Sequence, residues 1–97
     1  MSYSTIDPII SRWARRHGLH VYTTCKDEEV RAIRVTDQKG RTYGIGIDPP
    51  NAQGTITVRA YAWDFKKRHR EYVVSLPELE LCLENLWALL VAWMHER

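Results

Sequence analysis

The last stretch of the chain, residues 76–96, limits the fold more than any other part of the sequence. It reads LPELELCLENLWALLVAWMHE, and its leucines recur at steps of three and four, which places them on one face of an α-helix. Ser75 and Glu78 form the S-x-x-E capping box typical of a helix start, and His95 lies near the negative end of the helix dipole. We therefore expect a long C-terminal helix whose apolar face must be buried.

This helix carries more apolar surface than a single contact requires. Beside the main leucine stripe runs a second one, formed by Cys82, Leu89 and Trp93. One face of a small sheet covers a single stripe, so the second stripe needs another cover. Trp13 or aromatic residues of the sheet are candidates within the chain, and a second copy of the chain is the candidate outside it. From this surplus we expect a homodimer.

The composition is that of a folded domain rather than of a disordered segment. The chain has 97 residues, 44% of them hydrophobic, with four tryptophans and five tyrosines. We expect a single domain over residues 1–97, because a chain of this length forms one modest core. The formal net charge of +2 is too small to indicate a class of partner.

The sequence does not indicate a membrane protein or an exported one. The N-terminal residues lack the charged and apolar regions of a signal peptide. The longest uncharged apolar run, 86–94, is far shorter than the roughly twenty residues that span a bilayer. Cys25 and Cys82 stand far apart, without the spacing of a metal site or of a disulfide framework. We expect a cytoplasmic protein with free thiols and no cofactor.

A second helix is expected near the N-terminus. Asp7 fits the N-cap position and Pro8 the first helical position, where a missing amide proton costs nothing. Gly18 ends this helix, because glycine readily adopts the left-handed conformation that closes helices. Its apolar face includes Ile10 and Trp13, while arginines cover the other side.

Between the two helices the pattern changes to a period of two, which predicts five strands. Short polar turns between them imply antiparallel neighbours in chain order. This order, α-β-β-β-β-β-α, predicts a two-layer α+β fold: a five-stranded antiparallel meander with both helices on one sheet face. The expected strands are residues 19–24, 29–36, 41–48, 55–63 and 70–74, the last beginning at Arg70 or Glu71.

Two of these strands have features that simple alternation does not explain. Val30 and Ala32 are out of phase with Ile33, so the second strand either contains a bulge or buries arginine stems on one face. Gly44 and Gly46 alternate with isoleucines in the third strand. Glycines at such positions usually mark the close approach of a bulky neighbour.

The sequence holds no signature of catalysis. His17 and His20 have the H-x-x-H spacing of metal ligands, but Gly18 breaks the helix between them and no third ligand accompanies them. Gly44-Ile45-Gly46 lacks the third glycine and the following helix of a nucleotide-binding loop. We expect no catalytic residue and no metal site, so an enzyme is the least favoured class.

The stretch 59–72 is the one surface feature that suggests binding. It interleaves aromatic and basic residues, which stack on bases and bind phosphates in single-stranded nucleic-acid sites. A solvated hairpin tip beside aromatic residues is the plainer interpretation, since nucleic-acid-binding domains carry a larger positive charge. The candidate binding residues are Arg59, Tyr61, Trp63, Lys66, Lys67, Arg68 and Arg70.

Together these features favour a non-enzymatic interaction module of the adaptor, chaperone or inhibitor type. We expect it to self-associate through the C-terminal helix, with Cys82, Leu89 and Trp93 in the contact, or through the aromatic face of the sheet. The sequence does not specify a partner protein. The alternative function is a small nucleic-acid-binding domain that uses residues 59–72.

Overall fold

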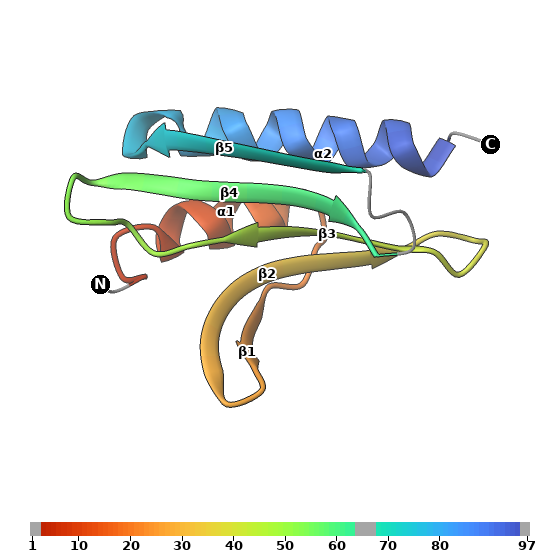
Figure 1. The fold of residues 1–97 in the computed structure, drawn as a ribbon, viewed down its shortest axis with the longest axis horizontal. Coiled ribbons are helices and arrows are strands. Elements are labelled where there is room, and N and C mark those ends of the chain that lie inside the picture. Colours follow the sequence, from red (N-terminus) through yellow and green to blue (C-terminus); the bar gives the residue numbers. More distant parts are fainter. Residues whose placement is uncertain (1–2, 64–67, 96–97) are drawn as a thin grey trace.

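The computed structural model describes residues 3–63 and 68–95, and these residues have the expected α+β architecture. Five strands form one antiparallel sheet, and an N-terminal helix and a long C-terminal helix pack on it (Figure 1). The predicted fold class is therefore confirmed. The elements are α1 (Asp7–Arg16), β1 (Tyr22–Cys25), β2 (Glu28–Thr36), β3 (Thr42–Ile47), β4 (Thr55–Ala62), β5 (His69–Ser75), the 3-10 turn η1 (Leu76–Glu78) and α2 (Leu79–His95).

The strands follow one another across the sheet in chain order, β1-β2-β3-β4-β5, and every neighbouring pair is antiparallel. Short connections explain this order, because a chain that turns back at once lies beside the strand it has just left. β2 bends strongly, so that its first half and β1 turn away from the plane of the other strands (Figure 1). β1 and β5 are the two edges of the sheet, and β5, with seven residues, is the longer.

The core lies between the sheet and the two helices. β4 alternates strictly between buried and partly exposed residues, as expected for a strand with one covered face. Trp13 of α1 and Leu83 of α2 are both 0% exposed against this covered face. The largest fully buried side chains include Trp13, Ile33, Tyr43, Ile45, Ile56, Val58, Leu79, Leu83, Leu86 and Leu90.

The C-terminal helix begins as the capping box predicts. The backbone amide and the hydroxyl of Ser75 both donate to the Glu78 carboxylate, at 2.9 and 2.8 Å, and these bonds lower the pKa of Glu78. The first turn is a 3-10 turn, and the α-helix proper runs from Leu79 to His95. In the described part of the chain, neither helix has the length and apolar composition needed to cross a membrane.

The prediction for the start of α1 is wrong, because Ile6 and not Asp7 is the N-cap residue, and the Ile6 side chain makes no capping hydrogen bond. The Asp7 carboxylate instead accepts hydrogen bonds from Arg31 of β2, from Nε at 2.6 Å and from Nη2 at 3.0 Å. A two-pronged charged pair is a stronger contact than a cap to a neutral amide, and it lowers the pKa of Asp7. Gly18, at the other end, has the left-handed φ of +66° that its role requires.

The same ion pair explains the irregular pattern of β2. Arg31 lies on the face that packs against α1, where it is only 9% exposed and its guanidinium is 4.3 Å from the centre of the Tyr3 ring. Its stem thus takes the place of an apolar side chain, so both alternatives left open by the sequence, a buried arginine stem and a bulge, occur in this strand. The pairing itself is also irregular, because β1 advances two residues from Tyr22 to Thr24 while β2 advances three between Ala32 and Glu29, so the extra residue of a bulge lies in β2.

Hydrogen bonds to Glu84 of α2 join the two helices. Its carboxylate accepts a bond from the indole Nε1 of Trp13 at 2.8 Å and lies 2.7 Å from Nε2 of His17. The Trp13 ring also meets Trp87 edge-on, with 6.5 Å between the ring centroids. α1 is therefore fixed to α2 by one buried tryptophan that has both an apolar and a polar contact.

Acid is expected to weaken this helix contact. The hydrogen bond from His17, and then that from Trp13, lower the pKa of Glu84 below its ordinary 4.5. Because the folded pKa is the lower one, the charged carboxylate stabilises the fold above pH 4.5, and this contribution is lost as the pH falls through the folded pKa. Glu84→Gln should therefore flatten the fall of the melting temperature between about pH 6 and pH 3. Glu28→Gln, at an exposed position of β2, is the matched control and should keep the wild-type slope.

Candidate binding surfaces

The face of the sheet turned away from the helices, which we call the open face, is built around a glycine. Arg34 of β2, Gly44 of β3 and Tyr61 of β4 lie side by side in register. The Tyr61 ring covers Gly44 so closely that a Cβ on that glycine would lie 2.6 Å from the tyrosine hydroxyl. The close approach predicted from the glycine pattern is confirmed at this position. The open face includes Ala32, Arg34, Gly44, Gly46, Thr57, Arg59, Tyr61, Trp63, His69, Glu71 and Val73.

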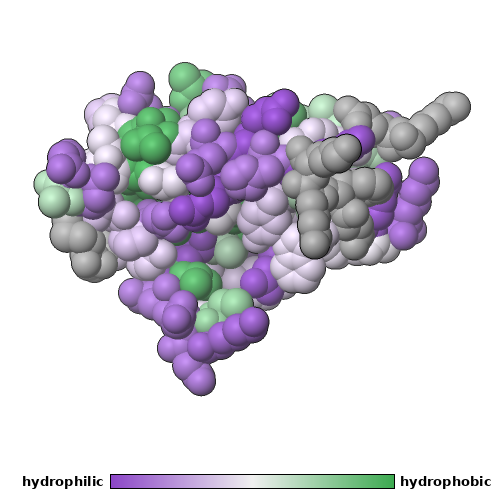
Figure 2. Space-filling view, in the orientation of Figure 1, coloured by the Kyte–Doolittle hydropathy of each residue, from purple (hydrophilic) through white to green (hydrophobic). Residues whose placement is uncertain are grey.

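The open face is mixed in character rather than uniformly apolar. Figure 2, in which the strands lie in front of the helices, shows hydrophilic residues around residues of intermediate hydropathy, with hydrophobic residues in small separate patches. Arg59 spans β3 to β5: it donates to both oxygens of Asp48, at 2.9 and 2.8 Å, and to Glu71 at 2.9 Å. These carboxylates, Asp48 first, raise the pKa of Arg59. The charge of Arg59 is thus balanced within the chain.

Arg34 is different, because no carboxylate contacts it within residues 3–63 and 68–95. Its guanidinium lies 5.1 Å from the centre of the Tyr22 ring and 5.2 Å from that of Trp63, and its Nη2 is 3.8 Å from the Cys25 sulfur. Its Nε is the one buried side-chain nitrogen or oxygen of the described residues that lacks a hydrogen-bond partner. A buried donor without an acceptor costs about 1–3 kcal/mol.

A hollow of about 260 Å³ opens beside Arg34. The bent hairpin of β1 and β2 forms one side of it, with Cys25 and Ala32, and β4 forms the other, with Arg59 and Tyr61. Gly46, whose missing side chain leaves space between the strands, also lines it. The hollow therefore exists because small residues and a bend occur together on this face.

The second candidate surface is the free edge of β5. The Ala62 amide donates to the Arg68 carbonyl. Because hydrogen-bonded pairs alternate along an antiparallel ladder, the backbone groups of Arg70, Tyr72 and Val74 also point toward β4. The backbone groups of His69, Glu71 and Val73 therefore point away from the sheet. Proteins usually blunt such edges with charges, prolines or bulges, but residues 72–75 have none of these and pair with β4 in unbroken register.

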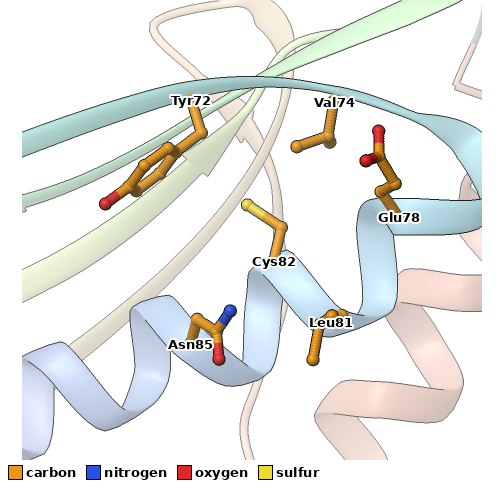
Figure 3. A pocket seen from close by; sticks show the side chains of 6 residues that line it. All are labelled: Tyr72, Val74, Glu78, Leu81, Cys82 and Asn85. Atoms are coloured by element: carbon orange, nitrogen blue, oxygen red, sulfur yellow. The ribbon is translucent and has the colours of Figure 1, made fainter.

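Apolar side chains beside this edge are exposed to solvent. Those of Tyr72, Val73, Leu76 and Leu81, which we call the β5 edge patch, are 48%, 62%, 39% and 64% exposed, and they flank the edge on both sides, because Val73 lies on the open face and Tyr72 on the opposite face. A groove of about 270 Å³ runs between β5 and α2 next to them. Figure 3 shows side chains from β5 and from α2 facing each other across this groove. Its lining residues are Tyr72, Val74, Glu78, Leu81, Cys82 and Asn85.

The structure brings together only part of the predicted nucleic-acid-binding stretch. Arg59, Tyr61 and Trp63 do share the open face, although the first is ion-paired and the second lies on a glycine. Lys66 and Lys67 lie outside the described residues. Trp63, 51% exposed, is the aromatic ring of this group with the most free surface, since Tyr61 is partly buried.

The two remaining basic residues of that stretch lie toward the other side of the sheet. Arg68 donates to the backbone carbonyl of Trp93 in α2 at 3.3 Å. Arg70 pairs with Ala60, whose side chain lies on the covered face of the sheet, and it is exposed only because β5 is an edge. Neither adds positive charge to the open face.

The residues predicted for self-association are largely covered by the chain itself. Cys82 and Trp93 are 8% and 6% exposed, and Leu89 packs against the same core while remaining partly buried. Tyr72 and Val74 of β5 lie across the groove from Cys82, and burial raises the pKa of its thiol. A partner would find more apolar surface at the β5 edge patch than at these three residues.

Sequence reasoning did not single out Arg34 or the β5 edge patch. Gly44 was the available signal for Arg34. A glycine in register with an arginine leaves room for an aromatic residue of the next strand to reach that arginine. Comparison of the chain with protein-family models, with curated proteins and with solved structures found no match. The side chains and their geometry are therefore the basis for any functional proposal.

Proposed function

We propose that this chain is a non-enzymatic interaction module that forms a homodimer by pairing β5 with β5 of a second copy. The observation that supports this best is a free seven-residue edge strand beside exposed apolar side chains. Antiparallel pairing about a two-fold axis uses the same surface on both copies, so one patch is sufficient. Open backbone groups at a sheet edge are ready templates for a further strand.

The charges of β5 favour one register for this pairing. A two-fold axis at Arg70 or at Glu71 would place two like charges directly opposite each other, which destabilises a strand pair. An axis at Tyr72 avoids both contacts and pairs the strand over its whole length. In that register Glu71 faces the partner's Val73, and the outward backbone groups of both residues can exchange hydrogen bonds.

The same register also brings opposite charges and apolar surfaces together. The partner's Arg70 would lie opposite Val74, at the groove that Glu78 lines. Glu78 already holds its carboxylate in place through the capping box, so less side-chain freedom is lost when an arginine approaches. The pair would fix the register of the dimer, while the β5 edge patch would provide most of the buried apolar area.

Val73→Lys is expected to convert the dimer to a monomer, because it places a charge in the middle of the apolar half of the edge. Light scattering or sedimentation at several concentrations would measure the change in mass. Val73 is 62% exposed, so the melting temperature of the monomer should change little. Ala88→Lys, which adds the same charge at an exposed position of α2, should leave the mass unchanged. A wild-type chain that stays monomeric up to about 100 μM would contradict the proposal.

A further inference from the structure

We propose that the hollow beside Arg34 on the open face binds a small ligand through a carboxylate or phosphate group of that ligand. The site is separate from the β5 edge patch and does not depend on the dimer. Three observations support it: a cationic group without a carboxylate partner in the described residues, a buried donor without an acceptor, and an open space next to both.

Arg34 is distinguished from neighbouring arginines by what it contacts. Arg31, Arg41 and Arg59 each bind a carboxylate of the chain, at 2.6, 2.7 and 2.8 Å. Arg34 instead interacts with the rings of Tyr22 and Trp63, the Cys25 thiol and the Tyr61 hydroxyl, none of which is a carboxylate. The planar guanidinium matches an oxyanion with two parallel hydrogen bonds, which is the contact that Arg31 and Arg59 already make. We infer that the missing partner of Arg34 is an oxyanion from outside the described chain.

The rings around Arg34 hold it in place. Tyr22 comes from β1 and Trp63 from the end of β4, so two distant segments lie against one guanidinium. A cation held against aromatic rings loses little further freedom when a ligand binds. Tyr22 and Trp63 are themselves 38% and 51% exposed, so their rings remain within reach of a ligand.

The hollow limits the size and the charge of the ligand. Its volume of about 260 Å³ lies just below the usual range of ligand pockets, which indicates a compact molecule rather than a nucleotide or a peptide. The Arg59–Asp48 pair on its wall is balanced internally, so the charge of Arg34 is not cancelled by it. The Tyr61 hydroxyl, which already interacts with Arg34, lines the same hollow and could also bond a ligand.

The test is an NMR titration of the wild-type protein with inorganic phosphate and, separately, with acetate, against sodium chloride at equal ionic strength. We expect one of the two oxyanions to shift the Arg34 Nε–H signal and the backbone amides of Cys25 and Gly46 in a saturable way. The apparent Kd should be about 10 mM or tighter. Saturation by phosphate alone identifies a phosphate ligand, and saturation by acetate alone identifies a carboxylate ligand. Shifts that do not saturate, or that chloride reproduces, would overturn the proposal.

Variants distinguish binding by the Arg34 guanidinium from a general effect of positive charge. Arg34→Gln should abolish the saturable shifts at Cys25 and Gly46, and Arg34→Lys, which keeps the charge but loses the fork, should weaken binding at least about tenfold. Arg15→Gln removes a charge at an exposed position of α1 and should bind as the wild type does. Val73→Lys should also bind normally, so a failure of this site is distinct from a failure of the dimer. Binding that survives in a folded Arg34→Gln protein would refute the assignment.

Discussion

Trp13→Ala is expected to lower the free energy of unfolding by about 3–5 kcal/mol. The Trp13 side chain is 0% exposed, and its removal would leave a cavity at the point where α1, α2 and the sheet meet. It would also remove the indole donor that Glu84 accepts at 2.8 Å, and the edge-on contact with Trp87. Domains of this size are stable by about 5–15 kcal/mol, so the variant should lose a large share of its stability.

Urea unfolding followed by circular dichroism would measure this change, because that signal does not depend on the tryptophan that is removed. Trp63→Ala is the matched control, since Trp63 is 51% exposed and lies on the open face. It should cost less than about 1 kcal/mol, mostly through its contact with Arg34. If Trp13→Ala leaves no folded protein, Trp13→Phe keeps most of the apolar volume and allows the loss to be measured. Equal effects of Trp13→Ala and Trp63→Ala would contradict the described core.

The fold could be predicted because its signals are local. The spacing of leucines in α2, the capping box at Ser75 and the strict alternation of β4 each specify one element without reference to the rest of the chain. Short turns then leave a meander as the simplest order of strands. The strand boundaries shifted by a few residues, since the ends of a strand depend on which neighbour continues to pair with it.

The error at the start of α1 arises because a residue far away in the sequence competes with the local backbone for the same carboxylate. Asp7 has the sequence signature of an N-cap, but Arg31 of β2 lies close enough to bind its carboxylate. The sequence cannot show this competition, because the two residues are brought together only when α1 packs on the sheet. The arginine's position on the covered face follows from the same pairing, which offsets the cost of placing a charge near the core.

The candidate sites were harder to predict because they depend on what is missing from their surroundings. Arg34 resembles any polar residue of a half-exposed strand, and only the contacts of its neighbours show that no carboxylate within residues 3–63 and 68–95 pairs with it. The exposure of Tyr72 and Leu81 depends likewise on whether another strand covers β5. Conversely, the stripe of Cys82 and Trp93 was expected to need a partner, and the chain covers most of it.

Gly44→Ala is expected to destabilise the protein by about 1–3 kcal/mol relative to Gly46→Ala, although both substitutions add one methyl group to the same face of β3. The new Cβ at Gly44 would lie 2.6 Å from the Tyr61 ring, whereas at Gly46 the nearest atom would be 3.9 Å away. Alanine restricts the unfolded chain more than glycine does, and this benefit is shared by the two variants. The difference therefore isolates the contact with Tyr61.

Thermal or urea unfolding of both variants measures this difference, and a second background tests its cause. In a Tyr61→Ala protein the ring is absent, so Gly44→Ala should then cost no more than Gly46→Ala does. The oxyanion titration gives a further readout, because Tyr61 lies between Gly44 and the hollow and must move when that glycine gains a side chain. Binding should then weaken in Gly44→Ala even at temperatures where the protein is fully folded. If stability falls but binding does not, Tyr61 supports the sheet without shaping the site, and Arg34 would have to hold the anion alone.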